Sequence, residues 1–361
     1  MGGAVRNALL GRPVHEVDLA TTAEPGDTTR RAAESGFKTV PTGIDHGTVT
    51  VLVKGRPFEV TSLREDVETD GRHAVVRFGR DFRADAQRRD FTINALSVGR
   101  DGALQDTTGG VADLAAGRVR FIGDPGQRIR EDYLRVLRFF RFSADYAEGP
   151  FDPDGLDASV RGRDGLAILS RERIRAELLR LLPARRSVEA VGLLSDGGLL
   201  GRLTGGVTDT GRLGRALDAN LPPSWLLAAL LVRTAEDTER LRERLRLSNA
   251  EAAALTEFAT ISARLASPSG PLGAGTIRRL AAEHGAEAIA RTAAIVAGEP
   301  RPVLAGDARA QLGRYADGSE AVPTFRLTGA DLVRAGLAPG PEVGRRLAAA
   351  RAAWLEDGCP E

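Results

Sequence analysis

The stretch from Arg128 to Phe142 restricts the fold of this chain most, because its apolar residues recur at the spacing of a helix. These residues are Ile129, Tyr133, Val136, Leu137 and Phe140. Their spacing of three and four predicts a single amphipathic helix over residues 128–142. Such a helix buries one side against a core and leaves its charged side open for chemistry.

The charged residues of this predicted helix share one side of it. Asp132 and Arg135 lie three residues apart, so their side chains leave the same face, which Arg138 and Arg141 continue. Such a pair can bind a nucleobase edge, because a carboxylate accepts from an exocyclic amino group and a guanidinium donates to a ring nitrogen or carbonyl. A salt bridge on a solvated helix is the commoner use of such a pair, and this stretch alone favours it.

Two carboxylates near the N-terminus indicate a metal ion. Residues 14–21 are expected to form a strand whose alternation places Glu16 and Asp18 on one side and apolar residues on the other. Carboxylates side by side repel each other, so a shared divalent cation explains the pair best, although an edge strand facing water also accommodates it. Glu59, in a predicted hairpin over 47–63, could equally be a third carboxylate or an ordinary surface residue.

The first half of the chain mixes strand and helix signals, whereas the second half is helical almost throughout. In the first half we expect helices over 4–10, 25–36 and 169–180, strands over 37–41 and 118–125, a hairpin turn at Lys54-Gly55, and loops over 64–86, 106–114 and 149–165. In the second half we expect helices over 188–194, 224–233, 237–247, 250–266, 276–297 and 305–312, and a helix, a Gly/Pro turn and a helix over 327–344.

Composition excludes several classes of protein. A net charge of +1 over 361 residues gives no global field for nucleic acid, so any polyanion site must be a local patch. The single Cys359 excludes an internal disulfide framework and a cysteine metal site. No signal peptide or membrane-spanning apolar run is visible, so we expect a soluble, cytoplasmic protein of two or three compact units.

Five motifs, in order, resemble those of one enzyme family. They are Gly2–Arg6, Glu16-Val17-Asp18, residues 88–95 (Arg-Arg-Asp-Phe-Thr-Ile-Asn-Ala), residues 131–135 (Glu-Asp-Tyr-Leu-Arg) and residues 170–174 (Ser-Arg-Glu-Arg-Ile). Each motif is weak alone, but the ordered set is similar to the bacterial class II tRNA nucleotidyltransferase (CCA-adding enzyme) and poly(A) polymerase family. The resemblance covers the first half of the chain closely and the tail loosely.

The resemblance implies an α/β nucleotidyltransferase head, with a small mixed sheet and helices, followed by an all-α neck, body and tail. The corresponding domains are a head over 1–142, a neck over 143–205, a body over 206–326 and a tail over 327–361. The implied reaction is addition of CMP and AMP from CTP and ATP to the 3′ end of tRNA, with release of pyrophosphate and with Mg²⁺ as cofactor. The implied partner is the acceptor arm of tRNA.

The resemblance also assigns roles to residues of this chain. Glu16 and Asp18 would be the catalytic metal ligands, Gly3 and Arg6 would contact the incoming nucleotide, Arg89 would contact its sugar or triphosphate, Asp132 and Arg135 would form the protein template that reads C or A, and Arg138 and Arg141 would support the nucleotide. This role for Asp132 and Arg135 agrees with the base-edge interpretation of the helix face.

Two departures from the family pattern stand out. The first metal position is Glu16 where the family usually has Asp, and the extra methylene moves the carboxylate by roughly an ångström. The family also has a strand ahead of its Gly-Gly pair, whereas Met1 directly precedes it here, so we expect the natural start to lie upstream.

Within the family, residues 55–63 resemble the corresponding segment of CCA-adding enzymes rather than that of poly(A) polymerases. The segment needed to switch from C to A addition fits residues 64–86. None of the four histidines is followed by Asp, so we do not expect the phosphohydrolase domain of some members; these are His15, His46, His73 and His284. An enzyme adding only CC, only A or a poly(A) run, and an RNA-binding relative that has lost catalysis, remain alternatives. The sequence does not predict the oligomeric state.

Overall fold

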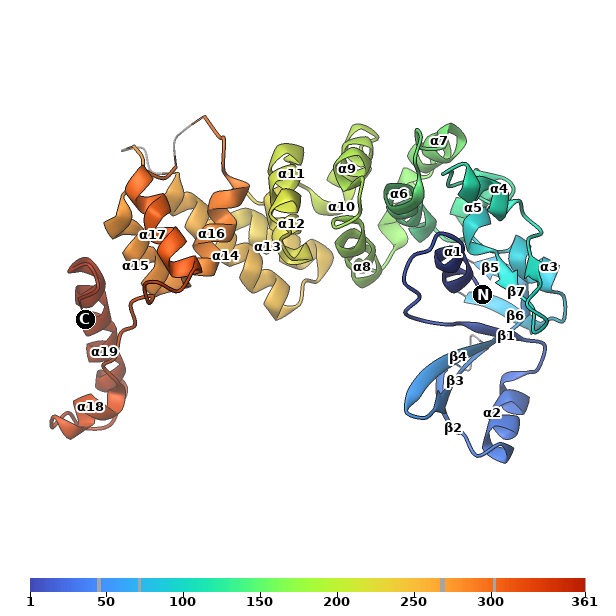
Figure 1. Ribbon diagram of the computed structural model, residues 1–361, viewed down its shortest axis with the longest axis horizontal. Coiled ribbons are helices and arrows are strands. Elements are labelled where there is room, and N and C mark those ends of the chain that lie inside the picture. Colours follow the sequence, from blue (N-terminus) through green and yellow to red (C-terminus); the bar gives the residue numbers. More distant parts are fainter. Residues whose placement is uncertain (44–46, 71–72, 267–269, 301–302, 361) are drawn as a thin grey trace. The chain divides into compact units, whose positions relative to one another are not determined.

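The computed structural model describes the whole chain except residues 44–46, 71–72, 267–269, 301–302 and 361 (Figure 1). For residues 42, 64–70 and 73–77 it describes the backbone alone. His46 and the middle of the predicted switching segment therefore lie outside the described residues. The chain divides into two compact units, Met1–Leu203 and Thr204–Glu361, and the finer division into four domains stays a prediction.

The first unit combines small sheets with helices. Its helices are α1 (Gly3–Leu9), α2 (Pro25–Glu34), α3 (Phe82–Gln87), α4 (Gly110–Ala115), α5 (Pro125–Glu131), α6 (Leu134–Tyr146), α7 (Pro153–Arg161), α8 (Arg171–Leu181) and α9 (Ser187–Asp196), with the 3-10 turns η2 (Thr92–Asn94) and η3 (Arg163–Ile168). Helix α10 (Leu199–Thr204) ends this unit. Its strands are β1 (Leu19–Thr21), β2 (Lys38–Gly43), β3 (Thr48–Val53), β4 (Arg56–Ser62), β5 (Arg64–Asp70), β6 (His73–Phe78), β7 (Ser97–Val98) and β8 (Leu104–Gln105).

The main sheet has the strand order β1-β4-β3-β2, with β1 parallel to β4 and the other pairs antiparallel. The turn between β3 and β4 is Lys54-Gly55, and both residues have positive φ, as a two-residue hairpin turn requires. Helix α2 packs on this sheet through Ala32, which joins a small core with Val49 and Val51. The predicted hairpin is confirmed.

The second unit is built from helices. They are α11 (Thr210–Asp218), α12 (Pro223–Leu231), α13 (Ala235–Leu245), α14 (Asn249–Leu265), α15 (Ala274–His284), α16 (Ala286–Ile295), α17 (Gly306–Ala316), α18 (Gly329–Arg334) and α19 (Pro341–Glu356). The predicted fold class, a small mixed α/β head followed by helices, is therefore confirmed. No helix in the described part of the chain is both long enough and apolar enough to cross a membrane.

An aromatic core beneath α6 fixes the position of the polar residues above it. Phe91 is fully buried, and its ring centre lies 4.8 Å from that of Phe121 and 5.3 Å from that of Phe142. Phe121 in turn stacks on Phe139 at 5.5 Å. Since Phe139 and Phe142 belong to α6, the residues next to Phe91 are held against this helix.

The predicted single helix over 128–142 is wrong, because the chain forms α5 and α6 with a break at Asp132. The backbone of Asp132 is extended, with φ −154° and ψ 106°, and its Oδ1 accepts a hydrogen bond from the amide of Leu134 at 3.1 Å. Short carboxylates compete for backbone amides in this way and favour helix starts over helix interiors. The apolar residues keep their helical spacing across the break, so their periodicity does not reveal it.

The predicted strand over 14–21 is wrong in its first part. Regular pairing with β4 begins only at the pair Leu19–Val60, and the carbonyl of Asp18 instead accepts from the N-terminal ammonium of Met1 at 2.6 Å. Glu16 and Asp18 therefore precede the strand and do not share a strand face.

Other loops and strands also differ from expectation. The predicted loop over 64–86 contains the β5–β6 hairpin and α3, because backbone pairing can form a ladder without an apolar pattern. Helices begin after Gly109 and Asp152, inside the predicted loops over 106–114 and 149–165. The predicted strand over 118–125 contributes only an isolated bridge between Phe121 and Phe91.

The predicted helix over 276–297 is also wrong as one element. It divides into α15 and α16 at Gly285, whose φ of 79° lies outside the helical region.

Candidate functional site

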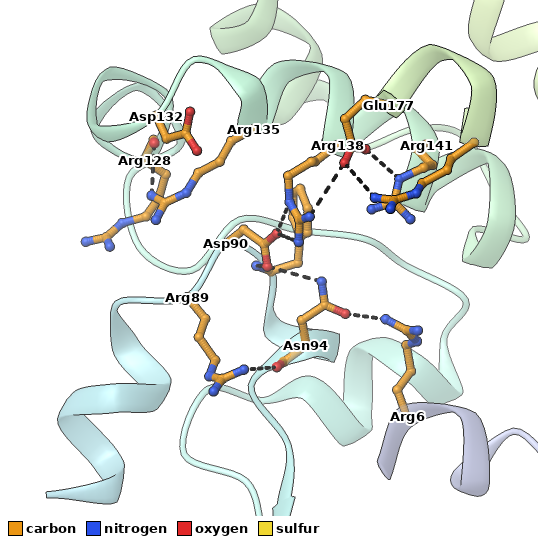
Figure 2. A network of polar contacts seen from close by, with 12 residues as sticks. Arg6, Arg89, Asp90, Asn94, Arg128, Asp132, Arg135, Arg138, Arg141 and Glu177 are labelled. Atoms are coloured by element: carbon orange, nitrogen blue, oxygen red, sulfur yellow. Dashed lines mark hydrogen bonds and ion pairs between the residues drawn. The ribbon is translucent and has the colours of Figure 1, made fainter. Parts of the chain in front are cut away.

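A buried carboxylate, Asp90, lies at the centre of the polar network above the aromatic core (Figure 2). Its Oδ2 accepts from Nε and Nη2 of Arg138 at 2.7 and 2.6 Å, and its Oδ1 accepts from Nδ2 of Asn94 at 3.1 Å. Burial acts to raise the pKa of Asp90, but Arg138, Asn94 and the Phe91 amide outweigh it and hold the pKa below its usual range. Asp90 is therefore negatively charged at neutral pH and binds Arg138 as an ion pair.

Asn94 connects Asp90 to the N-terminal helix. Its Oδ1 accepts from Nη1 of Arg6, which α1 presents from the opposite side in Figure 2. The Arg6 guanidinium is buried and lies 4.1 Å from the centre of the Tyr146 ring, a cation–π contact with α6. Arg6 is thereby held by two residues far from it in sequence, Asn94 and Tyr146.

The Gly2-Gly3 pair lets the backbone pass close to two arginines. A Cβ on Gly2 would lie 3.3 Å from Nη1 of Arg89, and one on Gly3 would lie 3.4 Å from Nη2 of Arg6. Gly2 also has a φ of 62°, which side chains rarely adopt. The glycines therefore bring backbone amides next to guanidinium groups, a combination suited to anions.

Arg89 is held by a second buried carboxylate. Its Nη2 lies 3.1 Å from Oδ2 of Asp85, and its Nη1 donates to the carbonyl of Asn94 at 3.4 Å. Asp85 also accepts from Nη2 of Arg88 at 2.5 Å. The network thus brings together four of the predicted nucleotide contacts: Arg6, Arg89, Arg138 and Arg141.

A third carboxylate, Glu177 of α8, joins the two arginines of α6. Its Oε2 accepts from Nε of Arg141 at 2.7 Å, and its Oε1 lies 3.8 Å from Nη1 of Arg138. The Glu177 side chain is 4% exposed. In Figure 2 it lies between the two guanidinium groups.

The two predicted template residues have separate partners and do not pair with each other in the described structure. Oδ2 of Asp132 accepts from Nη2 of Arg173 at 2.7 Å. Nη1 of Arg135 contacts Oε2 of Glu131 at 2.5 Å and also donates to the carbonyl of Arg128. Each group is therefore oriented by a neighbour, as recognition of a planar base requires.

The predicted metal ligands are open to solvent. Glu16 is exposed and Asp18 is partly exposed, and within the described residues neither carboxylate accepts a hydrogen bond or forms an ion pair. No group of three or more His, Cys, Asp or Glu side chains among the described residues is arranged to hold a metal. Glu59 and Asp18 each precede a partner in the Leu19–Val60 pair, so the third-carboxylate hypothesis stays open.

Two free carboxylates two residues apart fit a hard cation that keeps water and phosphate oxygens as its other ligands. Oxygen ligands of this kind suit Mg²⁺, which is commonly bound by one or two carboxylates together with substrate phosphates.

Several residues of this network had no role predicted from the sequence. Asp90 and Asn94 lie inside the motif over 88–95, and Arg173 lies inside the motif over 170–174, so the motifs carried the signal. Glu177 gave only a weak signal, a carboxylate on the buried side of α8, where charged residues are rare. Its partners could not be found without the packing of α8 on α6.

Comparisons with known proteins agree on one group of enzymes. Residues 1–120 match the family model of the poly A polymerase head domain. The chain is 39% identical over 257 residues to the mitochondrial CCA tRNA nucleotidyltransferase 1 of Danio rerio, covering 69% of this chain and 60% of that protein. It is 42% identical over 204 residues to the CCA-adding enzyme of Streptococcus gordonii, covering 55% and 49%.

Among solved structures, the Bacillus stearothermophilus CCA-adding enzyme in complex with CTP is similar at a TM-score of 0.72 and 27% identity. That likeness covers 99% of this chain and 88% of the other. The chain spans about 60% of the length of the first curated relatives that it matches.

Proposed function

Because this chain belongs to the family of bacterial class II tRNA nucleotidyltransferases and poly(A) polymerases, we propose that it adds CMP and AMP from CTP and ATP to the 3′ end of tRNA and releases pyrophosphate. The observation that carries this proposal is the network of Figure 2, in which Arg6 and Arg89 from two of the motifs and Arg138 from α6 surround Asp90 and Asn94. A cluster of oriented guanidinium groups next to a Gly-Gly turn is suited to a nucleoside triphosphate.

In this proposal, Glu16 and Asp18 would hold Mg²⁺. When bound, the metal supplies charge neutralisation and activation of the attacking tRNA hydroxyl, as in other phosphoryl-transfer sites. Arg6 and Arg89 would orient the triphosphate by charge-assisted hydrogen bonds, and Arg138 and Arg141 would support the nucleotide. Glu16 is compatible with this role because it precedes β1 and has no competing partner among the described residues.

Asp132 and Arg135 would select the base. Arg173 donates to Oδ2 of Asp132 and the Leu134 amide donates to Oδ1. Each oxygen keeps a second lone pair, which the amino groups of C and A would match with a donor. U and G place a carbonyl oxygen at that position. Leaving the carboxylate unmatched costs about 1–3 kcal/mol per lost hydrogen bond, and repulsion adds to this.

The RNA partner would be the acceptor arm of tRNA, bound through its phosphates and shape by arginine-bearing helices of the second unit. A Thermotoga maritima CCA-adding enzyme of similar fold has been solved in complex with tRNA. A cytoplasmic location is part of the proposal.

One incorporation assay tests the proposal. Full-length protein, Mg²⁺ and tRNA lacking its terminal CCA are supplied with labelled CTP, ATP, UTP or GTP, alone and together. We expect two CMP and one AMP to be added, with negligible use of UTP and GTP. A poly(A) run or a product ending after CC would favour the partial-activity alternatives, and tight tRNA binding without incorporation would favour a relative that has lost catalysis.

A further inference from the structure

We infer that Glu177 is a positioning residue that fixes the directions of the Arg138 and Arg141 guanidinium groups and thereby sets nucleotide affinity. This inference rests on the proposed function for the identity of the ligand. Glu177 lies on α8, outside all five motifs. Among the described residues, it contacts the proposed nucleotide-binding residues only through these two arginines.

The geometry around Arg138 is that of a clamp. Asp90 from the segment after α3 binds its Nε and Nη2, and Glu177 from α8 lies beside its Nη1. The Arg138 side chain is nevertheless 30% exposed. A guanidinium held by carboxylates on two elements cannot rotate freely, so its remaining donors point in one direction.

Arg141 depends on Glu177 more strongly. Its Nε donates to Oε2 of Glu177 at 2.7 Å, and its guanidinium carbon lies 4.2 Å from the centre of the Phe142 ring. No other carboxylate among the described residues forms an ion pair with Arg141. Removal of Glu177 therefore leaves Arg141 with its ring contact and the more distant charge of Asp145, but without its hydrogen-bonded carboxylate.

The burial of Glu177 supports a positioning role. A buried carboxylate is costly unless it is paired, and a buried ion pair is often no better for stability than a well-packed apolar group. Glu177 is surrounded by Arg138, Arg141 and the more exposed Arg180, whose Nη1 lies 3.6 Å away. Because stability alone does not explain a buried carboxylate here, we attribute it to the defined orientation of Arg138 and Arg141.

The second unit provides a matched control. Arg212 and Arg215 of α11 are also three residues apart, and one carboxylate, Glu299, serves both: its Oε1 lies 2.6 Å from Nε of Arg212 and 3.7 Å from Nη2 of Arg215. Glu299→Gln removes the same charge from a similar arginine pair in the unit without the proposed nucleotide contacts, where the carboxylate is 31% exposed rather than 4%.

The experiment measures the dissociation constants of CTP and ATP by calorimetry for the full-length wild type, Glu177→Gln and Glu299→Gln, with tRNA binding measured in parallel. We expect Glu177→Gln to weaken binding of both nucleotides by about tenfold, within the ~10²-fold that a 1 Å misplacement can cost, with tRNA binding unchanged. Glu299→Gln should leave nucleotide binding unchanged. Equal nucleotide affinity in wild type and Glu177→Gln would overturn the inference.

The direction of the change separates position from charge. If Glu177 acts only as a negative charge near an anionic ligand, Glu177→Gln binds nucleotides more tightly, and this result also overturns the inference. A double-mutant cycle with Arg141→Gln adds a second test. A residue that acts through Arg141 should add little to the loss caused by Arg141→Gln alone.

A second variant and an incorporation measurement resolve the remaining outcomes. If Glu177→Gln does not fold, Glu177→Asp keeps the charge but shortens the reach to Arg141, and it should still weaken nucleotide binding; unchanged affinity would count against positioning. If the wild type binds CTP and ATP but incorporates neither into tRNA, the proposed function fails while the comparison of affinities still decides the role of Glu177.

Discussion

Asp132 lies just before α6 and is proposed to read the amino group of C or A. Its carboxylate caps the start of α6 through Oδ1 and accepts from Arg173 through Oδ2, so it is oriented before any nucleotide arrives. Arg135 is oriented separately by Glu131. Since each group has its own support, the loss of one should not simply release the other.

This separation leads to a prediction about base selection. Asp132→Ala removes the acceptor that demands an amino donor, so UTP should be incorporated measurably while the catalytic efficiency with CTP and ATP falls. Arg135→Ala should weaken both natural nucleotides with a smaller change in discrimination. The measurement is the ratio of kcat/KM for CTP to that for UTP at fixed tRNA. An unchanged ratio in Asp132→Ala would mean that the residue only caps the helix.

Asp90 gives a prediction about pH. Its pKa is lowered in the folded chain, so the stability that its charge contributes is complete above the unfolded pKa of about 4 and is lost as the pH falls toward the folded value. At pH 7 we expect Asp90→Asn to be less stable by about 1–3 kcal/mol, below the ~3–5 kcal/mol for a fully buried pair because Arg138 is partly exposed.

The measurement is urea unfolding of wild type and Asp90→Asn at several pH values, followed by hydrogen exchange of the first unit. Both tryptophans, Trp225 and Trp354, lie in the second unit, so tryptophan fluorescence does not report on this change. The stability difference between the two proteins should shrink below about pH 4. A difference that grows on acidification would contradict the charged, anchored state of Asp90.

The junction of α5 and α6 depends on Gly165, which packs against Tyr133 at the start of α6. A Cβ on Gly165 would lie 1.9 Å from Cε1 of Tyr133, the residue between Asp132 and the start of α6. Gly165→Ala should therefore destabilise the first unit by about 1–3 kcal/mol, the usual cost of overpacking. Gly192→Ala in α9 is the matched control, because nothing lies within 4 Å of its added Cβ.

Gly192→Ala should be neutral or stabilise by about 0.4–1 kcal/mol, because alanine restricts the unfolded chain. Hydrogen exchange of α5 and α6 measures both variants. Equal protection of these helices in wild type and Gly165→Ala would show that Tyr133 moves aside without cost.

Features set by local backbone chemistry could be predicted from the sequence, whereas contacts between distant residues could not. The hairpin turn at Lys54-Gly55 and the N-cap of α8 at Ser170 were predictable, because each depends on local backbone chemistry. The break at Asp132 was not, since the apolar stripe runs through it. The clamp on Arg138 was beyond any local argument, because Asp90 and Glu177 lie 48 and 39 residues away in sequence (138 − 90 and 177 − 138) and meet only through packing.

The proposed catalytic residues and the proposed RNA-binding residues lie in different units. Glu16, Asp18 and the arginine network belong to Met1–Leu203, whereas the proposed RNA-binding helices belong to Thr204–Glu361. Catalysis and tRNA binding should therefore respond to different substitutions. RNA binding should weaken steeply with salt, because it depends on phosphate contacts and counterion release.

The sharpest prediction from this division concerns Asp18. Asp18→Ala removes one of two free carboxylates, so we expect incorporation in Mg²⁺ to be abolished while tRNA affinity and its salt dependence stay those of the wild type. Glu59→Ala, assayed beside it, tests the third carboxylate, and Asp27→Ala, a surface partner of Arg30 on α2, controls for charge removal in the same unit. Near-normal turnover of Asp18→Ala would refute the metal assignment. Loss of tRNA binding together with turnover would mean that the first unit also holds the RNA, and the division of work between the units would then be wrong.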